Sequence, residues 1–351
     1  MCCRSPPPPR ISPLTREPEN GLVHFDAYGL RYSLGGDWPE VVEDVRLDFE
    51  WFERPSAVER PSLHIEVARG SPELDRFGDI PAAFVTTRNV VFQDGDRTIV
   101  DYFGRALAVF DRARNHLLVE GEERHLVHEA VYLFVLSRIG EHLDRSSLMR
   151  LHGLGLSGPN GAVVVMLPSG GGKSTLALRA LKEPGVKLLS EDTPVLDRRG
   201  YVHPFPLRLG INSSDADSLP AGEVRRIERL EFQPKLVLSI DAFAEQIETR
   251  PQPLRHLVVG ERSLGREGGL EPVPRRALVG PLLREGVVGV GVAQMIEYVL
   301  QRGASDFFKQ GGVAARRAWC CTAALSRARA WRLRLGRDHE RNWAVLSQLL
   351  G

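Results

Sequence analysis

The stretch VVVMLPSGGGKSTL, residues Val163–Leu176, combines three segments of different character. It begins with an apolar run rich in β-branched residues, which is typical of a buried strand. A loop of small residues follows, and Lys-Ser-Thr then leads into a helix-forming segment, Leu176–Lys182. Because a phosphate-binding loop works in this strand–loop–helix order, the stretch predicts a site for the phosphates of a nucleotide.

Each part of this loop has a chemical role in binding phosphate. The glycines let backbone N–H groups turn inward as a nest, and the start of the helix adds unpaired N–H groups and a favourable dipole. We expect Lys173 to reach the β- and γ-phosphates of ATP, and the Ser174 hydroxyl to coordinate Mg²⁺. The residues expected to bind the nucleotide are Ser169, Gly170, Gly171, Gly172, Lys173, Ser174 and Thr175.

One position departs from the common phosphate-loop pattern. The pattern G-x-x-x-x-G-K-[ST] has a glycine where this chain has Leu167. A Gly/Ser-rich linker is the alternative interpretation. A linker would not follow an apolar strand and precede Lys-Ser-Thr, so the nucleotide site is favoured.

The composition is that of an ordinary globular protein. Of 351 residues, 42% are hydrophobic and 26% charged, and the length suits about two to three domains. The net charge of +1 creates no general attraction to nucleic acid or to a membrane surface. No apolar run is long enough to span a bilayer, and the N-terminus lacks the apolar core of a signal peptide. We therefore expect a cytoplasmic protein without nucleic-acid or membrane partners; a homo-oligomer is compatible with the sequence.

The chain divides into three predicted regions. Residues 1–20 form a proline-rich tail that we expect to be disordered. Residues 21–145 are predicted to form a mainly β domain that ends in a linking helix. Residues 146–351 are predicted to form the nucleotide-binding domain.

Periodicity supports the assignment of the second region. Leu63–Val67 alternates with period two, and Asp94-Gly95 is a hairpin turn signal between two strand-like runs. The period changes to 3.6 over Glu122–Leu143, which predicts a helix. His128 on this helix lacks the second histidine of a metalloprotease motif, and we interpret it as a surface residue.

A second strand ends in acids shortly after the loop helix. The run Val186–Asp192 is apolar until it reaches Glu191 and Asp192. Metal-assisted phosphoryl transfer needs one carboxylate to hold Mg²⁺ and one to accept a hydroxyl proton, and we expect Asp192 to bind the metal together with Ser174. Two adjacent acids in a strand face opposite sides, but a bend at the strand end would bring both to the site. A solvated β-turn is the alternative interpretation.

Three features, taken together, carry a resemblance to a known family. His152-Gly153, the loop ending in Gly172-Lys173-Ser174, and Glu191-Asp192 together resemble HPr kinase/phosphorylase and its broader relatives over residues 145–300. That family has a His-Gly strand, a phosphate loop at a similar distance, and an acid pair that ends the next strand. The matching residues are His152-Gly153, Gly172-Lys173-Ser174, Glu191-Asp192 and, more loosely, Pro204–Asn212.

The resemblance implies an α/β core within an α+β protein: a P-loop kinase core with a central mixed sheet, related to phosphoenolpyruvate carboxykinase. It implies a kinase that uses ATP and Mg²⁺ to phosphorylate a serine hydroxyl of a protein or peptide acceptor. Glu191 or Asp192 would be the catalytic base, with His152 close by and assisting that pair.

The chain departs from the family pattern at several positions. The acid pair is Glu-Asp rather than Asp-Asp, and Pro206 stands where a metal-binding Glu is expected. The segment 288–297 lacks the arginine of the family's Pro-Gly-Arg-Asn motif. The chain therefore resembles the divergent relatives of this family rather than the regulator of sugar uptake.

Two other functions stay open from the sequence. One is a nucleotide-binding switch that has no transfer activity, and the other is a small-molecule kinase. An ordinary P-loop ATPase or GTPase ranks last, because the chain has neither Leu-Ser-Gly-Gly-Gln nor Asn-Lys-x-Asp.

The C-terminal part yields four structural expectations. Arg250–Arg276 is rich in Pro, Gly and Arg, and we expect a mobile loop that acts as a lid over the site. Val292–Leu300 is predicted to be helical. Trp331–Leu335 alternates as a strand, and Asp338 is expected to cap the last helix.

Overall fold

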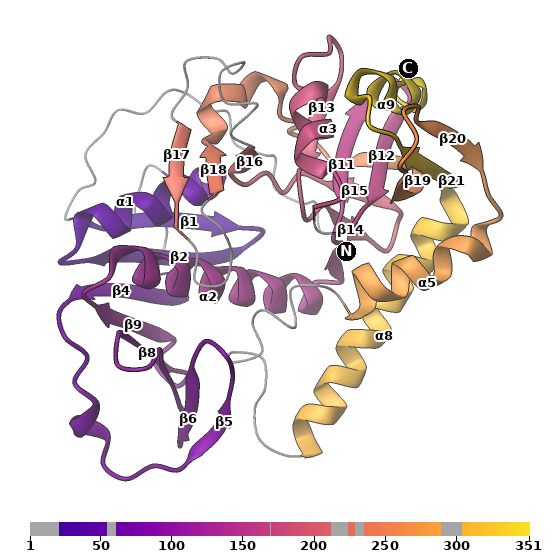
Figure 1. Cartoon of the computed structure of the whole chain (residues 1–351). Coiled ribbons are helices and arrows are strands. Elements are labelled where there is room, and N and C mark those ends of the chain that lie inside the picture. Colours follow the sequence, from indigo (N-terminus) through magenta and orange to yellow (C-terminus); the bar gives the residue numbers. More distant parts are fainter. Residues whose placement is uncertain (1–20, 55–60, 169, 212–223, 229–234, 289–303) are drawn as a thin grey trace.

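The computed structural model describes residues 21–54, 61–168, 170–211, 224–228, 235–288 and 304–351, with only the backbone at 288 and over 304–310. It is a mixed α/β structure with two large sheets, one small sheet and several helices (Figure 1). The tail 1–20, Ser169 and the expected helix Val292–Leu300 lie outside the described residues.

The N-terminal sheet has nine strands in the order β3-β1-β2-β4-β9-β8-β7-β6-β5. The β2–β4 and β4–β9 pairs are parallel and the others antiparallel. The expected hairpin forms at Asp94-Gly95, where Gly95 has the positive φ that the turn needs. The strands are β1 Val23–Ala27, β2 Leu30–Gly36, β3 Glu53–Arg54, β4 Leu63–Arg69, β5 Ala82–Val85, β6 Val90–Asp94, β7 Arg97–Asp101, β8 Ala106–Asp111 and β9 His116–Gly121.

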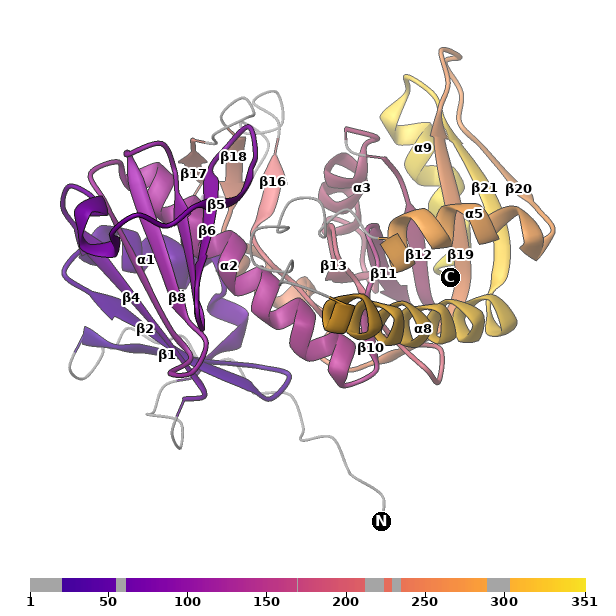
Figure 2. The ribbon, with the colours of Figure 1, turned by 90° about the horizontal axis from the view of Figure 1, so that it is seen from below.

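Two helices pack against each other and against the N-terminal sheet: α1, Pro39–Asp48, and α2, Arg124–Arg145. The predicted helix over Glu122–Leu143 is therefore confirmed as α2. Its residues Leu126, Ala130 and Phe134 recur at helical spacing and are buried, which explains why the segment is helical and which side faces the core. Figure 2 shows α2 running from this unit toward the second large sheet.

The C-terminal sheet runs in the order β10-β14-β15-β19-β12-β11-β13, and β21 and β20 continue it from β19. The predicted strand over Trp331–Leu335 is confirmed as part of β21. The strands are β10 Leu148–Arg150, β11 Leu154–Gly158, β12 Gly161–Met166, β13 Lys187–Ser190, β14 Val195–Asp197, β15 Tyr201–His203, β19 Gln252–Arg262, β20 Gly269–Pro272 and β21 Arg329–Leu335.

Strand β12 is buried along its whole length because helices cover both faces of the sheet. Val163 and Val165 join a core with α3, Lys173–Ala180, and α9, His339–Leu346. Val164 and Met166 join the opposite core, with α5, Val279–Leu282, and α8, Ala304–Arg327 (Figure 2). A strand buried on both faces needs a continuous apolar run rather than alternation, which is the pattern in the sequence. Asp338 caps α9 as expected, since its side chain accepts from the Arg341 N–H.

The expectation of a mobile loop over Arg250–Arg276 is wrong. The segment contains β19, which lies between β12 and β21 and is parallel to both, and the shorter strand β20, which pairs with β21. Its apolar residues Leu254, Leu257 and Val258 are buried. The short apolar run gave no clear strand signal in the sequence, because Pro, Gly and Arg residues surround it. It is a central strand because β12 and β21 pair with it on either side.

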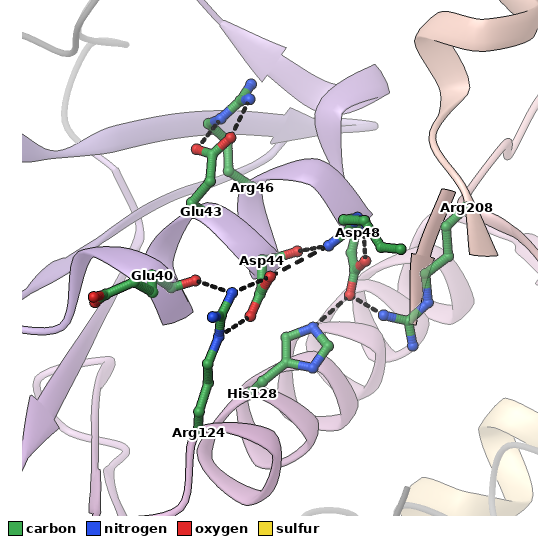
Figure 3. A network of polar contacts seen from close by, with 9 residues as sticks. Glu40, Glu43, Asp44, Arg46, Asp48, Arg124, His128 and Arg208 are labelled. Atoms are coloured by element: carbon green, nitrogen blue, oxygen red, sulfur yellow. Dashed lines mark hydrogen bonds and ion pairs between the residues drawn. The ribbon is translucent and has the colours of Figure 1, made fainter. Parts of the chain in front are cut away.

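A small sheet from the C-terminal half lies beside α1 (Figure 1). It has the order β16-β18-β17, with β16 Leu209–Ile211, β17 Val224–Ile227 and β18 Lys235–Leu238. Asp48, at the end of α1, is fully buried where these parts meet. It binds Arg208, which precedes β16, and its Oδ1 accepts from Arg225 Nη2 at 2.8 Å (Figure 3).

Asp48 also ties α1 to α2. Its Oδ2 lies 2.8 Å from His128 Nε2, and Figure 3 shows the carboxylate between His128 and Arg208. Burial raises the pKa of Asp48, but the charges of Arg208 and His128 outweigh burial and hold that pKa well below its usual range. The interpretation of His128 as a surface residue is wrong, because α1 covers the face of α2 that carries it.

We predict that Asp48→Asn lowers the free energy of unfolding by about 3–5 kcal/mol at pH 7, because it removes the buried carboxylate that pairs with His128, Arg208 and Arg225. Since the folded-state pKa of Asp48 is depressed, this contribution is fully present above the unfolded pKa of about 3.9 and begins to fall below it, and it is lost only as the pH reaches the folded-state pKa. Urea unfolding at pH 7 and at pH 3.5 measures both effects.

The matched control is Glu123→Gln, which removes an exposed carboxylate paired with Arg105. It should change stability by less than about 1 kcal/mol. Equal effects of the two substitutions, or no effect of Asp48→Asn, would contradict a structural role for the buried network.

Candidate active site

The loop between β12 and α3 adopts conformations that only glycine takes easily. Gly170 has φ +70° and Gly172 has φ +109°, both in the left-handed region. A Cβ on Gly170 would meet no atom within 4 Å, so the backbone conformation, rather than crowding, requires glycine there. A Cβ on Gly171 would lie 2.7 Å from the Pro168 carbonyl oxygen, so close packing requires that glycine. The residues from Gly170 to Thr175, which the sequence assigns to nucleotide binding, thus form a tight turn into α3.

Leu167, where the common loop pattern has glycine, has a structural explanation. Its side chain is buried and lies over Gly260 of β19: a Cβ on Gly260 would be 2.3 Å from Leu167 Cδ2. Because Gly260 has no side chain, there is room beside β19 for the leucine side chain that replaces the usual glycine of the loop. Leu167 is therefore accommodated by packing, and the turn that follows keeps its glycine conformations.

Lys173 points back across the loop from the start of α3. Its Nζ donates to the Leu167 carbonyl oxygen at 3.1 Å, and it lies 2.8 Å from His152 Nε2 and 3.4 Å from Asp192 Oδ1. Only 7% of the residue is exposed. The structure therefore brings together the lysine, the histidine and one acid of the pair that the sequence singled out.

The two acids after β13 reach different partners. The Ser174 hydroxyl donates to Glu191 Oε1 at 2.5 Å, whereas Asp192 Oδ1 lies 3.2 Å from His152 Nε2. A turn at the strand end, in which Thr193 N–H donates to Ser190 Oγ at 3.1 Å, lets adjacent residues face one site. The sequence paired Ser174 with Asp192 as metal ligands, but the carboxylate on Ser174 belongs to Glu191.

The surroundings push the pKa values of the two acids apart. Burial raises the pKa of Glu191, and the nearby charge of Asp192 raises it further. Desolvation by the surrounding residues also raises the pKa of Asp192, but hydrogen bonds from His152 and Lys173 and their positive charge outweigh it, so the pKa is about 2. Asp192 is therefore ionised at neutral pH, and its side chain is 53% exposed, which leaves it accessible to a substrate.

Glu285 completes the site, and sequence reasoning missed it. It lies in a π-helical turn, Leu283–Val288, and is only 4% exposed. Its Oε2 is 2.8 Å from His152 Nδ1, and its carbonyl oxygen accepts from the His152 N–H at 3.1 Å. The available signal was an Arg284-Glu285 pair within an otherwise apolar run, and no motif spacing marked it.

Glu285, His152 and Asp192 form one hydrogen-bonded line. Because the Glu285 carboxylate can only accept, the proton on the Glu285 side of the ring stays on Nδ1, and Nε2 faces Asp192 and Lys173. Burial lowers the pKa of His152, but Asp192 and Glu285 outweigh burial and raise that pKa above its ordinary value. A histidine held between two carboxylates can take up and release a proton at Nε2.

The chemistry of the donors fits Mg²⁺. Among the described residues, no group of three or more His, Cys, Asp or Glu side chains is arranged to hold a metal ion. Mg²⁺ is usually bound by one or two carboxylates together with substrate phosphates and water, so such a cage is not required. The Ser174 hydroxyl and the Glu191 carboxylate, already in contact, are oxygen ligands of the kind Mg²⁺ prefers.

Comparisons with known proteins add no family assignment. No family model matches the chain, and no curated protein matches it. The resemblance to HPr kinase/phosphorylase therefore stays a hypothesis that rests on the residues quoted above. Within the described part of the chain, no helix is both long and apolar enough to cross a membrane; the cytoplasmic location stays a prediction.

We predict that Glu285→Gln lowers the pKa of His152, because an amide cannot stabilise the imidazolium as a carboxylate does. An NMR titration of the histidine side chains, with the His152 signal assigned from a His152→Gln variant, measures this shift. Glu267→Gln, which changes an exposed glutamate, is the control and should leave the titration unchanged. An unchanged His152 titration in Glu285→Gln would show that the two side chains are not paired in solution.

Proposed function

We propose that the chain is an ATP-dependent kinase with a P-loop kinase core, which transfers the γ-phosphoryl group to a serine hydroxyl of a protein or peptide. One observation carries this proposal: Lys173 lies within hydrogen-bond distance of His152, which pairs with Asp192, and the residues next to these in the chain, Ser174 and Glu191, pair with each other. Phosphoryl transfer depends mainly on positioning and on charge stabilisation, and these groups supply both.

In this proposal the loop and the metal ligands hold the donor nucleotide. The backbone N–H groups of the loop and Lys173 bind phosphate oxygens, and Ser174 and Glu191 hold Mg²⁺. The metal, when bound, neutralises charge on the β- and γ-phosphate oxygens. Glu191 replaces Asp192 in the metal role expected from the sequence, because it is Glu191 that contacts Ser174.

The other acid, Asp192, is the proposed base for the acceptor serine. Asp192, ionised and partly exposed, accepts the proton of the serine hydroxyl as the oxygen forms its bond to the γ-phosphorus and the bond from that phosphorus to ADP breaks. The proton can pass to His152 Nε2, 3.2 Å from Asp192 Oδ1, while Glu285 holds the other side of the ring. The products are ADP and a phosphoserine.

A nucleotide-binding switch without transfer activity is the second candidate, and one observation favours it. Arg208, which the resemblance aligns with an arginine of the kinase family, is bound by Asp48 of α1 and stacks 4.1 Å from the ring centre of Tyr132. Pro206, close before it, replaces the acid of that family. A switch would bind Mg-ATP and label no acceptor. A small-molecule kinase would use the same site with a different acceptor.

Transfer of label from γ-labelled ATP to co-expressed proteins or peptides tests the proposal. We predict Mg²⁺-dependent labelling that falls by about 100-fold or more in Lys173→Ala and in Asp192→Asn, because one loses the phosphate cation and the other the base. Matched controls are Lys187→Ala and Asp197→Asn, since Lys187 is exposed at the start of β13, away from the acid pair, and Asp197 of β14 pairs with His203.

The two controls should keep their labelling. Undiminished transfer in Lys173→Ala would contradict the proposed site. ATP binding without any labelling of protein, peptide or small molecule would favour the switch.

A further inference from the structure

A cavity of about 270 Å³ opens beside the phosphate loop, on the flank away from the acid pair. Its lining includes Gly172 and Thr175 of the loop, Arg262 at the end of β19, Leu335 at the end of β21 and His339 at the start of α9. Arg262 and Leu335 are register partners on parallel strands, so they share one face of the sheet. The cavity and the loop thus have two residues in common.

Sheet topology shows on which side of the phosphate loop the cavity lies. Strands β12, β19 and β21 are parallel, so their carboxyl ends lie at one edge, where open α/β sheets bind ligands. Along that edge the order is β13-β11-β12-β19-β21, with the acids after β13 and the cavity beyond β12 on the other side. A nucleotide with its phosphates in the loop and its γ-phosphate toward Asp192 has its other end at the cavity.

The walls suit a planar base better than a further phosphate. Buried Leu176 and Leu335 form an apolar floor, and Arg262 Nη1 lies 3.5 Å from where a Cβ on Gly172 would be. A guanidinium plane and an imidazole both stack on aromatic rings. Two further cations line the cavity: Arg179 is already paired with Glu340, and Lys182 is exposed to solvent. Figure 1 shows α3, to which Leu176 belongs, and α9, which begins at His339, side by side.

We propose that this cavity binds the nucleoside half of ATP, with Arg262 and His339 stacking on the base and Thr175 at the junction with the phosphates. The inference rests on the proposed function, since it needs the triphosphate in the loop. It adds that the chain binds ATP more tightly than it binds the triphosphate alone. Arg262 and His339, which belong to no sequence motif, provide this difference in affinity.

Calorimetric titration of the full chain with Mg-ATP and with Mg-tripolyphosphate tests the inference without using activity. The wild type should bind ATP more tightly. The double variant Arg262→Ala/His339→Ala should lose about tenfold or more of its ATP affinity and keep its tripolyphosphate affinity. Arg334→Ala is the control, because Arg334 neighbours Leu335 on β21 but pairs with Glu271 outside the cavity, and it should change neither affinity.

Each other outcome overturns the inference. Equal loss of both affinities in the double variant would place Arg262 and His339 on the phosphates, and no loss would place the base elsewhere. A wild type that binds tripolyphosphate but gains nothing from adenosine would rule out a nucleoside site and leave the phosphate site intact. A wild type that binds neither ligand would overturn the proposed function and the cavity's role together.

Photo-crosslinking of the wild type with 8-azido-ATP covers the case of a variant that fails to fold. The proposed position of the base predicts labelled peptides from 172–182 or 335–342. Label in the N-terminal sheet or on the β13 side of the loop would overturn the inference.

Discussion

Burial of β12 on both faces is the constraint on which the rest of the site depends. The strand contributes Val163 and Val165 to one core and Val164 and Met166 to the other, so it cannot shift or rotate without exposing apolar side chains. The loop therefore leaves the sheet at a fixed point, and Lys173 begins α3 directly beyond it. Leu167 is held by the same packing, because it fills the space over Gly260 in the adjacent strand.

The electrostatics of the site follow from this placement. With Lys173 held against His152 and Asp192, the low pKa of Asp192 and the raised pKa of Glu191 follow from their different neighbours, although the two residues are adjacent in sequence. Environments that separate the pKa values of two acids also separate their roles. Glu285 extends the arrangement by fixing the His152 ring from the far side. The buried network around Asp48 ties α1 and α2 to segments of the C-terminal half, and one of its members, Arg208, lies against Tyr132 of α2.

Local sequence patterns predicted much of the fold and of the candidate site, and long-range packing accounts for the parts that they missed. The loop, the hairpin at Asp94-Gly95 and the helix that became α2 could be read from the sequence because each depends on residues close together in the chain. Glu285 lies 133 positions from His152, and Arg225 lies 177 from Asp48, so no local pattern indicates either contact.

Two incorrect expectations have the same origin. His128 is buried because a separate helix packs over it, and β19 is a central strand because β12 and β21 flank it. The segment Arg250–Arg276, which contains β19, is rich in Pro, Gly and Arg, and this composition favoured a loop when taken alone. The independence of the predicted domains at residue 145, the acceptor and the oligomeric state stay predictions of the sequence.

The central claim is that the loop, the acid pair and His152 form one phosphoryl-transfer site. A crystal structure of the chain with Mg²⁺ and a non-hydrolysable ATP analogue tests it most directly. The account predicts phosphates in the loop with Lys173 on their oxygens, Mg²⁺ on Ser174 with Glu191 beside it, and the Asp192 carboxylate facing the γ-phosphate. A nucleotide bound outside the loop, or a γ-phosphate turned away from Asp192 and His152, would contradict it.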